Sequence, residues 1–370
     1  MQRRLAPLHP SPSVPSWWPA LFEASGSDSI FLSAAWLQAW IARYGPSFDG
    51  TWVHWEVDGV VVGGCLLVER TVRVKRIPFH SLYVNATGDA GERSPFAEFN
   101  DVLHLPGHGA AVAADFARLL QQRSWSRLLL NGHQRQGVMA DALQALHDPY
   151  TEQVGEPSHY VDLAALGERP FAAALAGKAG TWVRRNQREF EQRLGPIRLR
   201  RAADLDETLA FFEQMRAMHL ARFGEPGKSS SLSYEGVVDF HRRLIAALFA
   251  RGEVDMLRVG SESHAIGYLY TFVVRGKVSL FQSGFAYEPS SKWSPGLLTH
   301  ALAIEHYRER GLREYDFLAG DALYKRTLAN RARELVWTTL YRDRPWIRLL
   351  LAGRRLRDRL ARPPALSAAD

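Results

Sequence analysis

A Ser-Pro-Gly sequence in the second half of the chain could bind an anion. Ser294, Pro295 and Gly296 stand at the start of a predicted helix. Backbone amides at a helix N-terminus have no intrahelical partner and bind groups such as a pyrophosphate. Lys292 could add a positive charge just before them. We therefore predict that these four residues bind a phosphate-bearing carrier, although Ser and Pro are also ordinary helix-starting residues.

A second cluster follows the next predicted strand. Asp316 lies in the strand-like run at 314–318, and Tyr324 and Lys325 follow the loop at Gly320. A carboxylate at this place could take a proton from an incoming amine or hydroxyl. Lys325 could bind a carrier phosphate or stabilise an oxyanion. Each residue also has a structural interpretation, in which Asp316 holds a basic residue, Tyr324 packs and Lys325 pairs with an acid.

Polar side chains on two neighbouring predicted strands could orient the acceptor of a transferred group. Tyr268 lies on one strand, and Gln282 and Ser283 lie on the next. Strict alternation places Gln282 and Ser283 on opposite faces of their strand. Buried polar side chains that satisfy each other would explain the same pattern.

The segment 178–201 is strongly basic, with eight Lys and Arg against two Glu. We predict a helix around 180–193, on which Arg184, Arg185 and Arg188 lie near one face because residues three and four apart are neighbours. Arg184 and Arg185 are therefore candidate ligands for carrier phosphates or an anionic acceptor. The alternative is a solvated basic face.

These residues need an α/β framework to bring them together. In the second half, capping residues and apolar periodicity predict helices from Asp204, over 233–251 and from Pro295 to Gly311, with strands at 256–260, 265–274, 277–285, 314–318 and 334–341. The first half shows the same plan, with a helix at 33–44, a hairpin at 52–68 that turns at Asp58-Gly59, a helix at 110–122 and a strand at 127–130. The repeat indicates an internal duplication of an α/β unit.

Short motifs connect these elements with a known family. They are FLSAAWLQAW at 31–40, WVRRNQR at 182–188, Gly-Tyr at 267–268, QSGF at 282–285, SPG at 294–296, YDFLAG at 315–320 and Tyr-Lys at 324–325. With these motifs, over residues 29–342, the chain resembles the GNAT acyltransferase superfamily, and more closely its BioF2-like or CelD-like branch, which is related to FemAB-type peptidyltransferases. The usual GNAT pyrophosphate loop, Gln/Arg-x-x-Gly-x-Gly/Ala, is absent, and SKWSPG at 291–296 stands in its place.

The resemblance implies a fold and an activity. It implies two fused GNAT-like units of the α/β (α+β) class, with mixed, mostly antiparallel sheets flanked by helices. It also implies acyl transfer from acetyl-CoA or another acyl-CoA, used as a co-substrate with no permanently bound cofactor, to an amine or hydroxyl. Asp316 would take the proton of the acceptor, and Tyr324 would protonate the leaving sulfur. Members of this branch are associated with polysaccharide or cell-envelope modification, which implies a saccharide or other small-molecule acceptor.

We divide the chain into four segments. Residues 1–28 are rich in Pro, Ser and Trp and are predicted to be irregular, 29–165 form an N-terminal GNAT-like unit, 166–344 form the C-terminal unit with the active site, and 345–370 form a basic amphipathic tail. The tail contains six Arg beside Trp and Leu residues, so it could dock on the protein or lie on a membrane surface.

Composition limits the remaining possibilities. Cys65 is the sole cysteine among 370 residues, which excludes an internal disulfide and a zinc site built on several thiolates. No His pattern for a metal and no nicotinamide motif is present, so we expect neither. The chain has no apolar run of membrane-spanning length and no secretory leader. We therefore expect a cytoplasmic protein, with the tail as a candidate contact to the inner membrane face.

Two other functions remain open. The basic segment at 178–201 would suit a FemAB-like transferase that uses aminoacyl-tRNA, although the long helical hairpin of classical tRNA-using members is missing. A GNAT scaffold with an altered pyrophosphate loop could also be a non-catalytic binding or assembly protein. No specific nucleic-acid partner is expected under the acyl-CoA reading.

Overall fold

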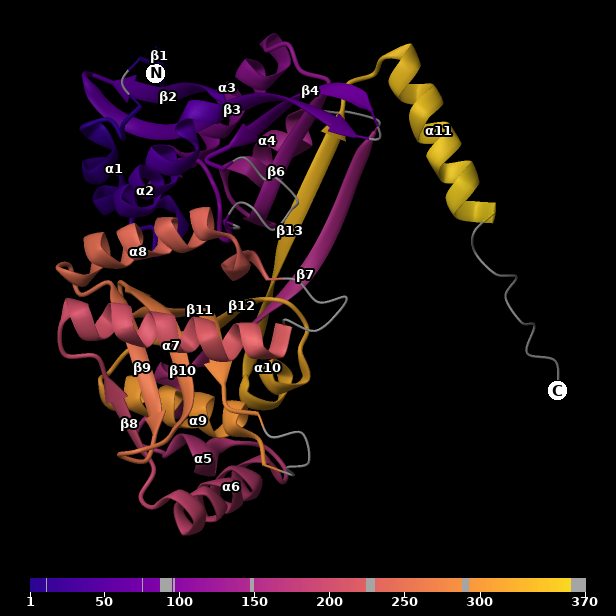
Figure 1. Ribbon diagram of the computed structural model, residues 1–370. Coiled ribbons are helices and arrows are strands. Elements are labelled where there is room, and N and C mark those ends of the chain that lie inside the picture. Colours follow the sequence, from indigo (N-terminus) through magenta and orange to yellow (C-terminus); the bar gives the residue numbers. More distant parts are fainter. Residues whose placement is uncertain are drawn as a thin grey trace.

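A single long sheet runs through the molecule and carries helices on its faces (Figure 1). The computed structural model describes residues 1–10, 12–74, 76–86, 95, 97–146, 150–223, 230–287 and 293–360. Within these residues the strand order is β1-β2-β3-β4-β6-β13-β7-β12-β11-β10-β9-β8, and β5 pairs with β3 beside this path. Lys292 lies outside the described residues, so its predicted role has no structural counterpart here.

The first half of the chain builds one end of the sheet. Its elements are β1 (Gln2–Pro7), α1 (Trp17–Ser25), α2 (Ala34–Tyr44), β2 (Asp49–Val57), β3 (Val60–Val74), β4 (Ile77–Val84), β5 (Leu103–His104), α3 (Gly109–Gln122), β6 (Arg127–Gln134), α4 (Val138–Leu146) and β7 (Thr151–Asp162). Ser33 caps α2 as expected, because its side chain accepts a hydrogen bond from the Trp36 amide. The expectation of an irregular segment at 1–28 is wrong, since β1 pairs with β2 and α1 packs beside β3.

The second half builds the other end. Its elements are α5 (Phe171–Ala174), α6 (Ala179–Leu194), β8 (Arg198–Arg201), α7 (Leu205–Phe223), α8 (Glu235–Phe249), β9 (Val254–Gly260), β10 (Ala265–Val274), β11 (Lys277–Phe285), α9 (Pro295–Glu309), β12 (Glu314–Ala319), α10 (Leu323–Leu328), β13 (Arg331–Tyr341) and α11 (Pro345–Leu360). Four 3-10 turns complete the described part, at Ile30–Leu32, Gly45–Ser47, Ala164–Leu166 and Ser231–Ser233.

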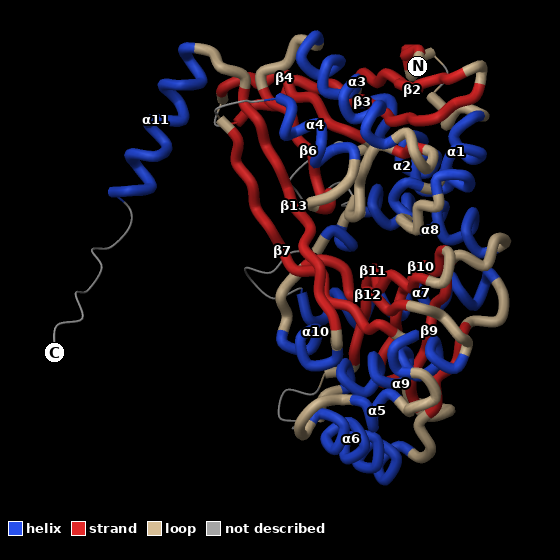
Figure 2. Tube along the Cα trace, turned by 180° about the vertical axis from the view of Figure 1, so that it is seen from behind, coloured by secondary structure: helices blue, strands red, loops and turns tan. Residues whose placement is uncertain are grey.

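The two halves exchange their last strands. In the first half the parallel pair β4 and β6 is followed by β13, which comes from the second half. In the second half the parallel pair β11 and β12 is followed by β7, which comes from the first. Figures 1 and 2 show β7 and β13 as a long antiparallel pair that links both ends of the molecule. The mixed, mostly antiparallel sheet flanked by helices is confirmed. The predicted boundary at residue 165 separates two halves of the chain, but the sheet continues across it because β7 and β13 each pair with strands of the other half.

Three apolar clusters hold these layers together. One lies between α2, α7 and α8, a second beneath α9 and a third beneath α3. The first cluster joins the two halves, since Trp36 of α2 packs edge-on against Phe240 of α8 with ring centroids 5.1 Å apart. Burial of such a side chain contributes about 1.5–3 kcal/mol, so this shared cluster fixes the halves against each other.

The tail begins as the helix α11, which leaves the body at one end of the sheet (Figure 1). Ile347 and Leu351 of its first turns pack against Phe79 and Tyr341. Leu349 remains 76% exposed. Among the described residues, no helix combines the length and the hydropathy needed to span a bilayer.

Candidate functional site

A cavity of about 640 Å³ opens between β11 and α10 in the second half of the chain. It is lined by Trp182, Met218, His219, Arg222, Gln282, Ser283, Gly284, Phe285, Tyr287, Ser294, Gly296, Leu297, His300, Ala322, Leu323, Tyr324 and Thr327. These residues come from α6, α7, β11, α9 and α10 and the loops beside them. A volume of this size is within the range of small-molecule sites.

The cavity exists because β11 and β12 separate. Their parallel pairing covers only Lys277–Ser279 of β11 and Glu314–Asp316 of β12. Just beyond, β11 carries a β-bulge, since Gln282 faces Tyr270 while Leu280 faces Thr271, which leaves Phe281 as the extra residue. A bulge bends its strand and frees local backbone groups. The two strands therefore diverge, and their open edges face the cavity.

The backbone of Ser283 presents polar groups on this open edge. Ala286 N donates to Ile266 O (3.0 Å), and antiparallel pairs alternate between bonded and non-bonded, so the pair Leu269–Ser283 is a non-bonded one. The amide and carbonyl of Ser283 thus point away from β10. Side chains occupy them instead: Gln282 Oε1 accepts from the Ser283 amide (3.0 Å), and His219 Nδ1 donates to the carbonyl (3.0 Å).

The N-terminus of α9 forms another wall of the cavity. Pro295 takes the first helical position, as predicted, and Asn186 Oδ1 of α6 accepts the Ser294 amide (3.1 Å). The following residues Gly296 and Leu297 line the cavity, and amides at these positions have no intrahelical partner. A side chain at Gly296 would lie 3.1 Å from the Phe285 ring, so glycine keeps this wall open.

Tyr324 lines the cavity on the side of α10. Its ring stacks on His300 of α9, with centroids 5.0 Å apart and planes at 5°. Burial raises the pKa of Tyr324 to about 12, and burial, with Lys325 nearby, lowers the pKa of His300 to about 3. Both side chains are therefore uncharged at neutral pH and can act only as neutral hydrogen-bonding groups.

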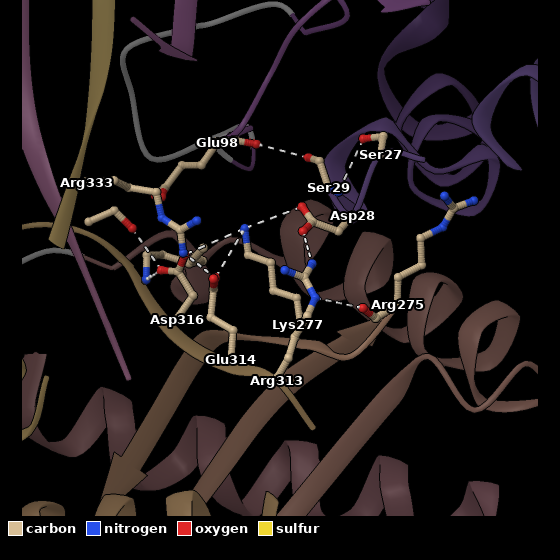
Figure 3. Close-up of polar contacts among 12 residues, drawn as sticks. Ser27, Asp28, Ser29, Glu98, Arg275, Lys277, Arg313, Glu314, Asp316 and Arg333 are labelled. Atoms are coloured by element: carbon tan, nitrogen blue, oxygen red, sulfur yellow. Dashed lines mark hydrogen bonds and ion pairs between the residues drawn. The ribbon is translucent and has the colours of Figure 1, made fainter. Parts of the chain in front are cut away.

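Asp316 does not reach the cavity, contrary to the predicted role of a base. It is 0% exposed, and its carboxylate accepts from Ser158 Oγ (2.8 Å), the Leu318 amide (2.7 Å) and Arg333 (2.8 Å). Lys277 Nζ lies 3.6 Å away (Figure 3). Both carboxylate oxygens of Asp316 therefore have partners. Asp316, Lys277 and Arg333 form a buried ion cluster where the two halves meet.

Lys325 is likewise turned away from the cavity. Its Nζ donates to the carbonyls of Leu318 (3.0 Å) and Ala319 (2.6 Å). Leu318 has a φ of 60°, a backbone conformation that a leucine rarely adopts. Lys325 thus holds the strained end of β12 and, through it, the start of α10. The structural interpretation of Asp316 and Lys325 fits their contacts better than the catalytic one.

Three further predicted residues, Tyr268, Arg184 and Arg185, also lie outside the cavity. Tyr268 is buried and packs on Phe211, with centroids 5.3 Å apart. Arg184 donates to the Ala172 carbonyl (3.3 Å), and Arg185 pairs with Glu189 (2.7 Å) on the surface of α6. Of the predicted residues, Gln282, Ser283, Ser294, Gly296 and Tyr324 are brought together at the cavity.

Sequence reasoning missed several lining residues. Trp182, Tyr287 and Leu323 are exposed apolar side chains around the cavity. Arg222 lies over the Tyr287 ring at 4.4 Å. Trp182 opens the WVRRNQR motif and could have been singled out there, whereas His300 looks like an ordinary residue of an apolar helix.

The equivalent place in the first half is filled by the chain itself. There β4 and β6 pair in parallel over Ser81–Tyr83 and Arg127–Leu129. Beyond this, the Asn100 amide donates to the Gly132 carbonyl (3.1 Å), and Asn100 Nδ2 donates to the Val84 carbonyl (2.9 Å). The segment around Asn100 therefore bridges the two strand ends, whereas the corresponding ends of β11 and β12 border the cavity.

Comparison with known proteins finds one family model that matches part of the second half. Residues 177–326 match the family model described as acetyltransferase (GNAT) domain. This stretch contains β11, α9, β12 and the start of α10, so most of the cavity lies in the part of the chain that matches a GNAT domain, and the resemblance seen in the motifs is confirmed. No curated protein matches the chain significantly in sequence.

Solved structures resemble the chain in fold along nearly its whole length. FemX has a TM-score of 0.60 at 10% identity, with 95% of this chain and 100% of that chain covered. L-PGS from Bacillus licheniformis has a TM-score of 0.53 at 13% identity, with 94% and 97% covered. A conserved protein of unknown function from Bacteroides thetaiotaomicron has a TM-score of 0.50 at 8% identity, with 88% and 96% covered. At these identities the likeness concerns the fold alone.

Proposed function

We propose that this protein is an acyltransferase that moves an acyl group from acyl-CoA, with acetyl-CoA as the first candidate, to an amine or hydroxyl acceptor. The observation that supports this most is the course of the cavity. It continues from the N-terminus of α9 at Ser294 and Gly296 to the phenol of Tyr324. One molecule with an anionic end and a reactive carbonyl could thus contact both.

The open edge of β11 suits an extended carrier arm that contains amide groups. The backbone groups of Ser283 and Phe285 point to the side where β12 is missing, and an arm would displace the partners that now occupy them, among them the Tyr287 amide on the Phe285 carbonyl (3.1 Å). An arm with amides can bond to such an edge as an added strand would. The first half supports this reading, because a peptide segment around Asn100 bridges the corresponding strand ends there.

In the proposed reaction the acceptor attacks the thioester carbonyl directly. The Ser283 amide would hold the carbonyl oxygen as it becomes an oxyanion, once the Gln282 carboxamide moves aside. Tyr324 keeps its proton at neutral pH because its pKa is raised, so its hydroxyl donates a hydrogen bond to the departing sulfur. Carbon–sulfur cleavage then releases the carrier as a thiol that takes up one proton from water, which balances the proton that the acceptor loses to water.

No carboxylate lines the cavity among the described residues. Asp316 forms buried ion pairs with Arg333 and Lys277 and does not reach the cavity, so it is not the base of the proposed reaction. Water at the open side of the cavity would instead remove the proton of the acceptor. The rate should then rise with pH as an amine acceptor loses its own proton.

The donor is tested by binding. A ligand that binds only the folded protein raises the melting temperature, by mass action, when its concentration exceeds Kd. We expect acetyl-CoA and CoA to raise Tm, whereas adenosine triphosphate alone should raise it less because it lacks the arm. A Tm that does not move with acetyl-CoA, longer acyl-CoAs or CoA would contradict the proposed donor.

Aminoacyl-tRNA is the second candidate donor. The FemX likeness in fold over 95% of the chain and the basic helix α6 beside the cavity favour it. Binding of tRNA through phosphate contacts falls steeply as salt rises. Salt-sensitive binding of aminoacyl-tRNA, together with no binding of CoA, would favour this donor.

For the acceptor we propose only a chemical class, and for the reaction only a cellular compartment. The family resemblance suggests a saccharide or another envelope precursor as acceptor. An acyl-CoA donor favours a cytoplasmic reaction. The exposed Leu349 and Trp346 on the basic helix α11 offer a contact to an anionic membrane surface.

A further inference from the structure

His300 carries a polar atom that the protein leaves without a partner. The side chain is 1% exposed and lines the cavity from α9. Its Nδ1 lies 3.3 Å from the hydroxyl of Tyr315, whereas its Nε2 has no hydrogen-bond partner among the described residues. A buried polar atom without a partner destabilises a folded protein, because it has lost its hydrogen bonds to water. Its presence therefore calls for an explanation.

Hydrogen-bond counting fixes which nitrogen carries the proton. The imidazole is neutral because burial lowers its pKa to about 3. If the Tyr315 hydroxyl donates to Nδ1, the proton of the ring sits on Nε2, and Nε2–H alone lacks a partner. If Nδ1 donates instead, both the Tyr315 proton and the lone pair of Nε2 lack one. The first arrangement leaves fewer groups unsatisfied, so Nε2 is the donor.

We propose that His300 Nε2–H donates a hydrogen bond to a carbonyl oxygen of the bound donor. This rests on the proposed function, because it names the ligand of the same cavity. The carbonyl is either that of the acyl group or that of an amide in the carrier arm, since both present the same acceptor oxygen. The parallel stack with Tyr324 would fix this carbonyl relative to the phenol. His300 is thus a specificity-determining residue for a carbonyl-bearing ligand.

The double variant His300→Phe with Tyr315→Phe tests the proposal. It keeps an aromatic ring on Tyr324 and removes the unsatisfied donor together with the hydroxyl that would lose its partner. Apolar replacement of both groups is close to neutral or stabilising. We expect the ligand-free variant to melt at the same or a higher temperature than the wild type, while Kd for acetyl-CoA, measured by calorimetry, rises roughly tenfold.

Matched variants and a second probe sharpen the result. Tyr315→Phe alone keeps Nε2 but removes the hydroxyl that fixes its tautomer, so its Kd for acetyl-CoA should lie between those of the wild type and the double variant. His300→Gln should recover part of the affinity through its amide N–H. CoA lacks the acyl carbonyl. A loss of affinity for acetyl-CoA alone assigns the acyl carbonyl as the partner, and an equal loss for CoA assigns an amide of the arm. Equal Kd values for the double variant and the wild type would overturn the proposal.

A measurement without ligand separates this proposal from the proposed function. Nitrogen-15 shifts of the His300 ring report the tautomer directly, and we expect the proton on Nε2. A proton on Nδ1 would overturn the proposal whatever the ligand is. A wild type that binds neither acetyl-CoA nor CoA would instead contradict the proposed donor, and the tautomer would still decide whether Nε2–H is offered to the cavity.

Discussion

Tyr324 and His300 illustrate, at the residue scale, how a site can act without charge. The pKa of the phenol lies near 12 and that of the imidazole near 3, and in both cases burial is the largest cause. Neither group changes its charge between pH 5 and pH 9. Such a pair stabilises charge that develops on a substrate by hydrogen bonds that are already in position.

Removal of the Tyr324 hydroxyl should therefore slow the chemical step and leave donor binding intact. For Tyr324→Phe we expect kcat to fall roughly a hundredfold, with KM for acetyl-CoA nearly unchanged because the ring still stacks on His300. Tyr341→Phe, which alters a phenol that packs with α11 and does not line the cavity, serves as the control. An unchanged kcat in Tyr324→Phe would rule out the proposed contact to sulfur.

Asp316 gives a prediction of the opposite kind. Asp316→Asn keeps the shape of the side chain but leaves Lys277 and Arg333 without one buried counter-charge. Loss of one partner from a buried ion cluster destabilises a protein by about 3–5 kcal/mol. We expect urea unfolding at lower concentration, with kcat retained by the folded protein.

The exposed Asp321, which pairs with Arg326 and His159 at the surface, provides the matched control. Asp321→Asn should change the free energy of unfolding by less than about 1 kcal/mol. If Asp316→Asn were as stable as this control and yet inactive, Asp316 would have to act in the reaction after all.

At the scale of elements, the site depends on how β11 is placed between α7 and α9. Gly284 of β11 faces α7 so closely that a Cβ atom would lie 2.2 Å from the Met215 carbonyl oxygen. No side chain can be added there without a shift of the helix. His219 and Arg222, which line the cavity, stand further along the same helix.

Gly284→Ala should thus push α7 away from β11. Overpacking of this kind destabilises proteins by about 1–3 kcal/mol, and it should also weaken acetyl-CoA binding because the cavity wall moves. Gly353→Ala in α11 meets no atom within 4 Å and should leave stability equal or slightly higher. Thermal unfolding of the two variants compares them, and an unaltered Tm in Gly284→Ala would refute the contact.

Helices with clear capping signals, such as α2 and α7, were predicted because those signals are local, whereas α1 lies in the segment that was expected to be irregular. Ser33 and Gly45 bound α2, and in α7 the Asp204 carboxylate accepts the Glu207 amide (2.8 Å) as a capping box requires. The bulge at Phe281 could not be predicted, since its residues read as ordinary alternation. The exchange of β7 and β13 could not be predicted either, because strand partners depend on contacts far apart in the sequence.

The contrast between local signals and distant contacts also explains which predicted site residues reach the cavity. The backbone-defined positions at Ser294, Gly296 and Ser283 follow from turn and strand signals and lie on its wall. Asp316 and Lys325 were assigned from their residue types alone. Their partners, Arg333, Ser158 and the carbonyls at the end of β12, become visible only when distant strands are paired.

At the scale of the whole molecule, Glu98 connects the first half to the site of the second. Its carboxylate accepts the Ala319 amide (2.7 Å) at the end of β12. Burial, with smaller contributions from Asp316 and Glu156, raises the pKa of Glu98 to about 7, and the Ala319 amide and Lys325 act against this. The contact is therefore sensitive to pH in the neutral range.

Stability should fall as pH rises through this range. Between its ordinary value near 4.5 and about 7, Glu98 keeps a proton in the folded protein that the unfolded chain has released. This contribution is complete below pH 4.5, falls as pH rises from 4.5 through 7, and is absent above that range. Glu98→Gln cannot ionise, so relative to the wild type it should gain stability from pH 5 to pH 8.

The difference between the two proteins in urea unfolding at pH 5, 6, 7 and 8 isolates this group. Asp101 and the buried histidines contribute equally to the pH dependence of both proteins, so their contributions cancel in the difference. A constant difference over the four pH values would mean that Glu98 does not change its charge in this window.

The proposed donor site is tested most directly by calorimetric titration of acetyl-CoA into the wild type and two variants of α10. Thr327 lines the cavity, so Thr327→Trp should fill part of its 640 Å³, whereas Arg326 on the same helix is exposed and does not line it. We predict that the wild type and Arg326→Trp bind with similar Kd, and that Thr327→Trp binds at least roughly tenfold more weakly. A wild type that does not bind, or three equal values of Kd, would contradict a donor site between β11 and α10.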